Sequence, residues 1–351
     1  MVPFESECAL PTRESEAVRA RVPASSANLG PGFDVFSVAL ESPHIDVELA
    51  TAPVGTRKIV IEGVHAAEID TDPNLNAAGK ALSALVDTFG KPSGYVLRMK
   101  GEIPPGKGLG RSGAEAVGAV ICADRKFKLG LDDVQMVQMA GKAEPSHHLD
   151  NVSASALGGF NIVTRSSVDG REAVTTILPP KDLGVAVLVP TVEKPSTEIA
   201  RRLVPFQIKT TEHVRAMGYA GRISAAFAQG DVQAILETVP WDGVVEPARA
   251  NGGLYGYGVD SNHLWEEKKI LLEKFHVAET ISGAGPSRAL WYSISEDHNQ
   301  KRRNKIGIIQ PAIELVTDRL KSLGYEVREA FVTKPSSKGA TIITARDADK
   351  K

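Results

Sequence analysis

Four glycines lie close together at residues 106, 108, 110 and 113, between a pattern typical of a strand and one typical of a helix. Glycine has no Cβ atom, so backbone N–H groups in such a loop can approach an anion closely, and the first free N–H groups of the following helix point to the same place. A phosphate is the natural occupant. Residues 108–113 also satisfy G-x-G-x-x-G, so a dinucleotide fingerprint, a nucleotide-phosphate loop and a plain glycine turn are all open.

The strand before the loop narrows these alternatives. In residues 95–103, Tyr95, Leu97 and Met99 alternate with Arg98 and Lys100. This pattern is typical of a strand with one wet face, not of a central strand in a parallel sheet. A dinucleotide fingerprint normally lies in the first βα unit, whereas here a long segment precedes it and two prolines adjoin the turn. No G-x-x-x-x-G-K-[ST] run occurs, which excludes a Walker loop.

Strand and helix patterns alternate irregularly in both halves, which favours an α+β fold over a doubly wound sheet. Strand patterns cover residues 18–24, 44–52, 58–64, 183–190, 278–285, 288–295, 326–334 and 339–345, and helix patterns cover 76–90, 131–144, 196–203, 209–229, 263–274 and 310–323. A chain of 351 residues is too long for one ordinary core. We expect a loose tail at 1–17, an N-terminal domain at 18–182 and a C-terminal domain at 183–351.

Charge and cysteine content exclude several classes of protein. The formal net charge is −2, so no global field favours nucleic acid or an anionic membrane. Cys8 and Cys122 lie far apart, which gives neither a disulfide framework nor a metal cluster, and a reducing cytoplasm is the expected location. Four glutamates precede any apolar run, and no apolar stretch approaches 18 residues, so we expect no signal peptide and no membrane span.

Three segments resemble the three motifs of the GHMP small-molecule kinases, in family order: residues 22–34, 104–113 and 281–290. Four others are similar to segments of the homoserine kinase branch: residues 148–160, 196–205, 244–250 and 330–343. The resemblance covers residues 20–345. It implies an N-terminal domain like domain 2 of ribosomal protein S5 and a ferredoxin-like C-terminal domain. It also implies transfer of the ATP γ-phosphate to the side-chain hydroxyl of L-homoserine, a step of threonine biosynthesis, with ATP and Mg²⁺ as cofactors.

The resemblance also implies how the amino acid is held. Arg201 and Arg249 match the positions that bind the substrate carboxylate, a task suited to the bidentate guanidinium group. Asn28 and Asp34 match those that hold the amino end. The alternatives are a solvated helix face for Arg201, beside Arg202, and local turn chemistry for Asn28 and Asp34.

The segment 148–160 supplies the remaining substrate contacts. By resemblance His148 contacts the amino acid, Asn151 orients the hydroxyl, and Asp150 secures the loop. Asn151 and Arg201 are the implied catalytic residues. We expect no strong general base, because Pro23-Ala24-Ser25 occupies the place where mevalonate kinases carry a lysine. Metal binding by His148 is disfavoured, since His147 beside it points elsewhere on regular structure and no cysteine lies nearby.

The nucleotide end has its own expected residues. The ATP-binding residues implied are Asn76 at the adenine, then Pro105, Gly106, Lys107, Gly108, Leu109, Gly110, Arg111, Ser112 and Gly113. Ser112 and Glu144 match the magnesium pair of the family, and Mg²⁺ takes only one or two protein oxygens when phosphates supply others. An alternative is that Ser112 and Glu115 form a capping box. Arg111 departs from the family pattern and either touches phosphate or pairs with Glu115; Arg288 is also unusual.

Other functions stay open. The acceptor could be pantoate, shikimate or mevalonate, although the arginines with His148 and Asn151 argue against mevalonate. The chain could also be a catalytically silent sensor of ATP or an amino acid. Binding of RNA is disfavoured by the near-neutral charge. The family suggests a homodimer.

Overall fold

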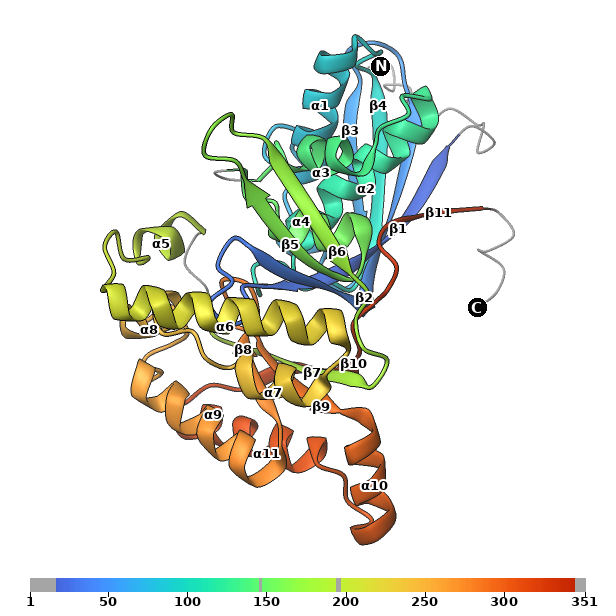
Figure 1. Ribbon diagram of the computed structural model, residues 1–351. Helices are drawn as coiled ribbons and strands as arrows, with labels where there is room; N and C mark the ends of the chain where they lie inside the picture. Colours follow the sequence, from blue (N-terminus) through green and yellow to red (C-terminus); the bar gives the residue numbers. More distant parts are fainter. Residues whose placement is uncertain (1–16, 145–146, 194–196, 345–351) are drawn as a thin grey trace.

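The computed structural model describes residues 17–144, 147–193 and 197–344. Nearly all of the predicted tail, residues 1–17, lies outside them, as do residues 345–351 of the predicted second domain. The described chain forms two sheets with helices packed around them (Figure 1). The predicted α+β class is confirmed, since antiparallel and parallel pairs occur in one sheet.

The first sheet has seven strands. They are β1 (Val18–Ala27), β2 (Phe36–Thr51), β3 (Arg57–Glu62), β4 (Tyr95–Gly101), β5 (Phe160–Arg165), β6 (Glu172–Ile177) and β11 (Thr341–Ile343). The order is β11-β1-β2-β4-β3, with β5 joined to β2 and β6 to β5. Only β3 and β4 run parallel among these described strands. The predicted wet face of β4 is present, because Lys100 is exposed between buried Met99 and half-buried Gly101.

Four α-helices accompany this sheet: α1 (Ala77–Phe89), α2 (Arg111–Phe127), α3 (Asp133–Gly141) and α4 (Asp150–Leu157), with the short 3-10 helix η2 (Ala66–Glu68) before α1. Helix α2 packs closely on the sheet because Gly118 has no side chain; a Cβ atom there would lie 2.4 Å from a methyl group of Val47. This close contact holds α2, which begins directly after the glycine loop, against β2.

The second sheet has the order β10-β7-β9-β8 and is antiparallel throughout. Its strands are β7 (Leu183–Pro190), β8 (Ala278–Ile281), β9 (Arg288–Ser293) and β10 (Val327–Thr333). Its helices are α5 (Thr197–Arg202), α6 (Thr210–Gln229), α7 (Val232–Thr238), α8 (Val245–Asn251), α9 (Ser261–Phe275), α10 (Ile294–Asn304) and α11 (Ile309–Ser322). The chain then returns to the first sheet, where β11 pairs with β1. The domain division at residue 183 stays a prediction.

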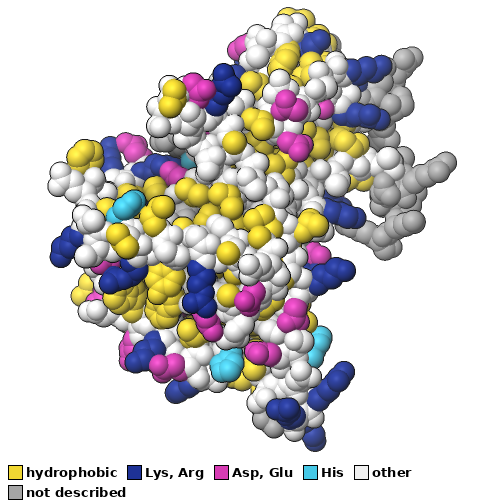
Figure 2. Space-filling view, viewed as in Figure 1, with side chains coloured by type: hydrophobic (Ala, Val, Ile, Leu, Met, Phe, Trp, Pro, Cys, Tyr) yellow, Lys and Arg dark blue, Asp and Glu magenta, His cyan; other side chains and the backbone are white. Residues whose placement is uncertain are grey.

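One apolar core joins the two sheets. Phe160 of β5 stacks on Phe227 of α6 with ring centroids 3.9 Å apart, and Phe36 of β2 lies 5.1 Å from Phe160. Buried Val185 and Trp291 of the second sheet belong to the same cluster. On the face in Figure 2, acidic and basic side chains are interspersed. Within the described residues, no helix has the length and apolar character needed to cross a membrane.

Candidate active site

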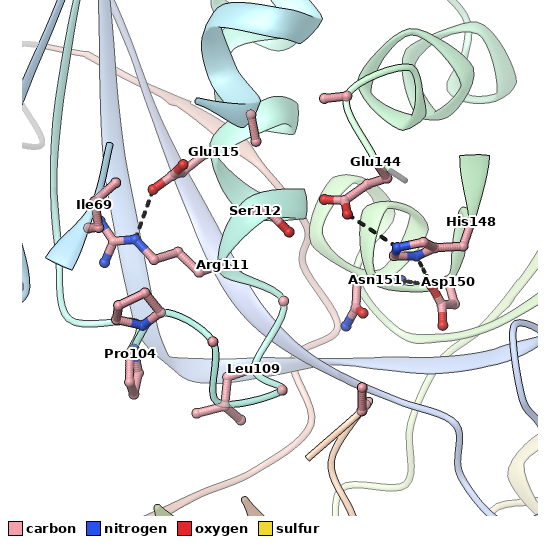
Figure 3. A pocket seen from close by; sticks show the side chains of 18 of the residues that line it. Ile69, Pro104, Leu109, Arg111, Ser112, Glu115, Glu144, His148, Asp150 and Asn151 are labelled. Carbon is pink, nitrogen blue, oxygen red and sulfur yellow. Dashed lines mark hydrogen bonds and ion pairs between the residues drawn. The ribbon is translucent and has the colours of Figure 1, made fainter. Parts of the chain in front are cut away.

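A cavity of about 420 Å³ lies where the motif loops meet. Its wall combines the turn after β1, the segment between η2 and α1, the glycine loop, the beginning of α4, and single residues of α5 and α8. Gly283 and Ala284, from the turn between β8 and β9, complete it. Segments far apart in the sequence therefore share one site, part of which is shown in Figure 3.

The glycine loop has the backbone that the sequence predicts. Gly106, Gly108 and Gly110 have φ values of +67°, +78° and +68°, in the left-handed region that favours glycine. A Cβ atom on Gly108 would lie 2.0 Å from Ser282 O, and Ser282 Oγ donates to Gly108 O at 2.7 Å. The third motif thus shapes the loop, and the N-terminus of α2 faces the cavity behind it.

The alternative that Ser112 and Glu115 form a capping box is wrong. The N-cap of α2 is Gly110, which has no side chain to cap with, and Ser112 is the second residue of the helix. The left-handed turn at Gly110 moves the helix start two residues before the serine. As a result Ser112 is exposed on the cavity wall, whereas Glu115 lies buried behind it and pairs with another residue.

Glu115 pairs with Arg111, so the structure shows the second of the two alternatives for that arginine. Arg111 Nε donates to Glu115 Oε1 at 2.8 Å and Nη1 donates to Ile103 O at 2.6 Å, with both charged side chains 5% exposed. Burial raises the pKa of Glu115, and the Arg111 charge opposes the shift. Arg111 thereby joins the beginning of α2 to the segment two residues after the end of β4.

Asn76 is bound into this network. It is the N-cap of α1, where its Oδ1 accepts from Ala78 N and Gly79 N. Its Nδ2 donates to Asp70 O at 3.0 Å and to Glu115 Oε2 at 3.3 Å. Both donors and both lone pairs are used, so a contact with adenine would need other atoms of the residue.

Two residues of the predicted ATP-binding set do not line the cavity, Lys107 and Gly113. Lys107 Nζ donates to Pro190 O at 3.2 Å and to Val192 O at 2.8 Å, which ties the loop to the end of β7. Burial lowers the pKa of this lysine. Gly113 lies against α4, where a Cβ atom would come 3.4 Å from Val152 N.

His148 lies between two carboxylates (Figure 3). Its Nδ1 is 2.9 Å from Asp150 Oδ1, and its Nε2 is 3.2 Å from Glu144 Oε2. Burial alone would lower the pKa of His148, but the hydrogen bonds to Asp150 and Glu144 outweigh it and raise the pKa to about 10. The raised pKa favours the imidazolium form at neutral pH, and both ring nitrogens are already directed at carboxylates, so neither is available to a metal ion or to a substrate proton.

One carboxylate oxygen of Glu144 is not hydrogen-bonded to any described residue. His148 occupies Oε2, while buried Oε1 has no hydrogen-bond partner in the described part of the chain. Glu144 and Ser112 both line the cavity, Ser112 from the first turn of α2. A carboxylate oxygen and a hydroxyl in one wall are oxygen donors of the kind Mg²⁺ accepts.

Opposite charges also meet at the other end of the cavity. Arg201 Nη1 and Nη2 donate to the two oxygens of Asp34 at 2.8 and 2.9 Å. The guanidinium of Arg201 lies 5.5 Å from the Phe33 ring centroid and that of Arg249 lies 4.9 Å from it. Asn28 Oδ1 accepts from Asp34 N, and Asn28 Nδ2 donates to Gly283 O at 2.9 Å. These contacts fix the first motif against the third.

Sequence reasoning missed several residues of the wall: Phe33, Glu68, Ile69, Asp70, Leu75, Lys80 and Ala143. Phe33 had a signal, because it is an aromatic residue inside the first glycine turn, next to Asp34. Lys80 and Ala143 lie in predicted helix patterns, where nothing shows which residue faces a cavity. Glu68, Ile69, Asp70 and Leu75 had no signal either, since the segment from η2 to α1 has no periodic pattern. It is held from the second sheet, where Arg328 of β10 hydrogen-bonds Glu68 and, with His65, lowers the pKa of Glu68 to about 2.

Comparison with known proteins adds independent information. The family model for the GHMP kinases N terminal domain matches residues 76–159. A homoserine kinase of Methanococcus maripaludis is 32% identical over 269 residues, which are 76% of this chain and 84% of that protein. A homoserine kinase of Thermoplasma acidophilum is 34% identical over 275 residues, 77% of this chain and 83% of that protein.

Solved structures agree on the fold. The crystal structure of homoserine kinase from Cytophaga hutchinsonii superposes with a TM-score of 0.76 at 23% identity, covering 98% of this chain and 100% of that one. Mevalonate diphosphate decarboxylase from Staphylococcus aureus superposes with a TM-score of 0.67 at 13% identity, covering 94% of this chain and 98% of that one.

Proposed function

The chain belongs to the homoserine kinases of the GHMP kinase family, and we propose that it phosphorylates L-homoserine with ATP, giving O-phospho-L-homoserine for threonine biosynthesis. One observation carries the proposal. A single cavity joins a glycine loop at a helix N-terminus to an Asp34–Arg201 ion pair, with Asn151 in the same wall. The first feature suits a nucleotide phosphate, and the second suits a zwitterion.

The ion pair favours an amino acid over other hydroxyl acceptors. Asp34 and Arg201 neutralise each other, and a zwitterion presents an ammonium to one and a carboxylate to the other. Both charges therefore stay paired when the substrate enters, whereas a pantoate or shikimate anion would satisfy Arg201 and leave Asp34 unpaired. We assign the carboxylate to Arg201 and Arg249, and the ammonium to Asp34 and Asn28.

The phosphate end has donors and oxygen ligands that fit ATP with Mg²⁺. The glycine loop and the first N–H groups of α2 would hold the phosphates. Ser112 and the unpartnered Oε1 of Glu144 would hold Mg²⁺, which when bound neutralises charge on the phosphate oxygens. The apolar side chains of Ile69, Leu75 and Pro104 form the part of the wall where we expect the base.

Catalysis in this scheme is positioning plus charge stabilisation. Asn151 accepts a hydrogen bond from the substrate hydroxyl, whose oxygen forms the new bond to the γ-phosphorus while the bond to the ADP oxygen breaks. The hydroxyl proton leaves to solvent once the phosphate ester has formed. Arg201 contributes by holding the carboxylate so that the hydroxyl lies in line. His148 directs both ring nitrogens at Asp150 and Glu144, so neither is placed to accept the substrate proton.

A coupled assay of ADP release tests the proposal with L-homoserine, L-serine, L-threonine, pantoate and shikimate. We expect kcat/KM for L-homoserine to exceed that for each other acceptor by about 100-fold or more, since a site built for polar groups discriminates strongly. Turnover of pantoate or shikimate with none of L-homoserine would contradict the acceptor. Release of ADP with none of them would contradict a kinase and favour a sensor.

A homodimer and a cytoplasmic location remain predictions from the family and from the cysteine content. Light scattering on the purified full chain tests the first, and fractionation of the source cells tests the second. A mass of one subunit of 37.4 kDa would contradict the homodimer.

A further inference from the structure

Asn151 touches a buried serine of the first motif. Its Nδ2 lies 3.0 Å from the Oγ of Ser25, which belongs to β1 and is 0% exposed. Asn151 lines the cavity from the first turn of α4, whereas Ser25 lies behind the wall. A hydroxyl that cannot reach a substrate thus contacts the residue that would meet the substrate hydroxyl.

The neighbouring groups decide which end of the amide faces Ser25. Ser155 Oγ donates to Pro23 O at 3.1 Å. Ser25 Oγ donates to the backbone oxygen of Asn151 at 3.4 Å. Ser25 Oγ also lies 3.4 Å from Ser155 Oγ. Since the Ser25 proton points to the backbone oxygen, its hydroxyl oxygen accepts from the Asn151 Nδ2 group that lies 3.0 Å away. The Oδ1 atom of Asn151 is then left for the cavity, and no described residue donates to it.

The glycine loop packs directly against this contact. A Cβ atom on Gly110 would lie 2.1 Å from Ser25 Oγ and 2.9 Å from Asn151 Nδ2. Ser25 N also donates to Leu109 O at 3.2 Å. The serine, the amide and the phosphate loop are therefore packed as one unit, and the amide orientation is set from behind the wall.

We propose that Ser25 is a positioning residue that orients the Asn151 amide for phosphoryl transfer, an inference that rests on the proposed function. With Oδ1 toward the cavity, the acceptor hydroxyl donates to it and keeps its oxygen lone pairs for the γ-phosphorus. With NH₂ toward the cavity, the hydroxyl oxygen would accept a hydrogen bond, and a lone pair would be engaged. Ser25 selects the first arrangement.

The kinetic test compares Ser25→Ala in two backgrounds. In the wild-type background we expect kcat to fall about tenfold while the KM values for ATP and L-homoserine stay within about twofold, since only orientation in the transition state is lost. In the Asn151→Ala background we expect the same substitution to cost less than about twofold in kcat, because it acts through the amide. An equal loss in both backgrounds, or an unchanged kcat, would overturn the inference.

Ser37→Ala is the matched control. Ser37 is also 0% exposed, lies on the neighbouring strand β2, and contacts Ser153 of α4 at 3.4 Å without touching Asn151. We expect it to keep kcat in both backgrounds. A fall in kcat like that of Ser25→Ala would mean that any buried hydroxyl at this interface matters, which would also overturn the assignment.

A second measurement does not depend on activity. The side-chain NH₂ signal of Asn151, identified in ¹⁵N spectra by its loss in Asn151→Ala, should shift in Ser25→Ala and stay unchanged in Ser37→Ala. If the signal shifts but the wild-type chain does not phosphorylate L-homoserine, the proposed function fails and the contact stands. If the chain is an active kinase and the signal does not move, the positioning role fails.

Discussion

Asp34 and Arg201 hold each other through two hydrogen bonds of 2.8 and 2.9 Å across 167 residues of sequence. Both side chains are partly exposed to the cavity, at 33% and 23%. The pair lies where the proposed substrate would bring a charge of each sign. The two charges therefore neutralise each other when no substrate is bound. When a zwitterion binds, each side chain exchanges its partner for the opposite charge of the substrate, so neither is left unpaired.

Asp34→Asn tests the ammonium site. Asn tolerates the left-handed backbone at this position, where φ is +57°, so the loop should stay intact. We expect KM for L-homoserine to rise about 10- to 100-fold, the scale of a lost charged hydrogen bond, with KM for ATP nearly unchanged. Glu198→Gln is the control, because it breaks the exposed pair with Arg202 on the same helix as Arg201. Steady-state kinetics with each substrate varied would contradict the assignment if both KM values rose together.

Phe33→Leu tests the aromatic platform beneath the two arginines. Both guanidinium groups lie within 5.5 Å of this ring centroid, so the substitution removes two cation–π contacts while keeping an apolar side chain. Contacts of this kind contribute about 0.5–1 kcal/mol each when partly exposed, so KM for L-homoserine should rise about 5- to 30-fold. Phe206→Leu, at a side chain 98% exposed, is the control. Isothermal titration calorimetry should show an equal loss of affinity for L-homoserine. An unchanged affinity would contradict the role of Phe33 as a platform for the two arginines.

The sequence motifs predicted the cavity wall better than they predicted what each side chain does there. Asn28, Asp34, Ser112, Glu144 and Asn151 all line the cavity, because short motifs with turn residues fix local backbone wherever they fold. The direction of Lys107 was not predictable, since its partners are carbonyl groups 83 and 85 residues away, at the end of β7 and just beyond it. Likewise, nothing local shows that Ser282 shapes the phosphate loop.

The secondary structure was also predicted only in part from the sequence. Helix α10 was missed because its residues are almost all polar and lack apolar periodicity. A signal was present, since Ser293 caps the helix by accepting from Glu296 N, which fits the spacing S-x-x-E. Strand β6 was missed because its sequence does not alternate apolar and polar residues, as fits a strand with no buried residue.

Glu144→Gln tests the magnesium ligand. The amide keeps the shape of the side chain but removes the anion whose Oε1 has no partner in the described structure. We expect the Mg²⁺ concentration for half-maximal activity to rise about tenfold, with a smaller effect at saturating Mg²⁺, because the metal keeps its phosphate and water ligands. Ser112→Ala should shift the same titration in the same direction. An unchanged titration in both variants would remove these residues from the metal site.

Arg111→Ala tests whether the buried pair beneath the loop is structural. Removal of the guanidinium leaves Glu115 buried and unpaired, which should cost about 3–5 kcal/mol in the free energy of unfolding. Urea denaturation should show this loss, with KM for ATP changed much less. The double variant Arg111→Met with Glu115→Leu should recover much of the stability, because it removes both charges. A raised KM for ATP at unchanged stability would instead indicate contact with phosphate.

Glu279→Gln tests the buried cluster around Arg288, the second departure from the family pattern. Glu279 is 0% exposed, its Oε1 lies 3.3 Å from Arg288 Nη1, and Glu267 and Lys268 of α9 also face it. Burial, with the Glu267 charge, raises the pKa of Glu279 well above its ordinary value. The folded state therefore keeps this proton where the unfolded chain has lost it, so its stabilising effect is complete below the unfolded pKa and is lost as pH rises.

The glutamine side chain of the Glu279→Gln variant is neutral at every pH. In urea unfolding, the variant should gain stability relative to wild type between pH 5 and pH 8, while Glu314→Gln, at an exposed position of α11, should track wild type. A difference in the free energy of unfolding between variant and wild type that stays constant with pH would show that Glu279 is ionised in the folded protein.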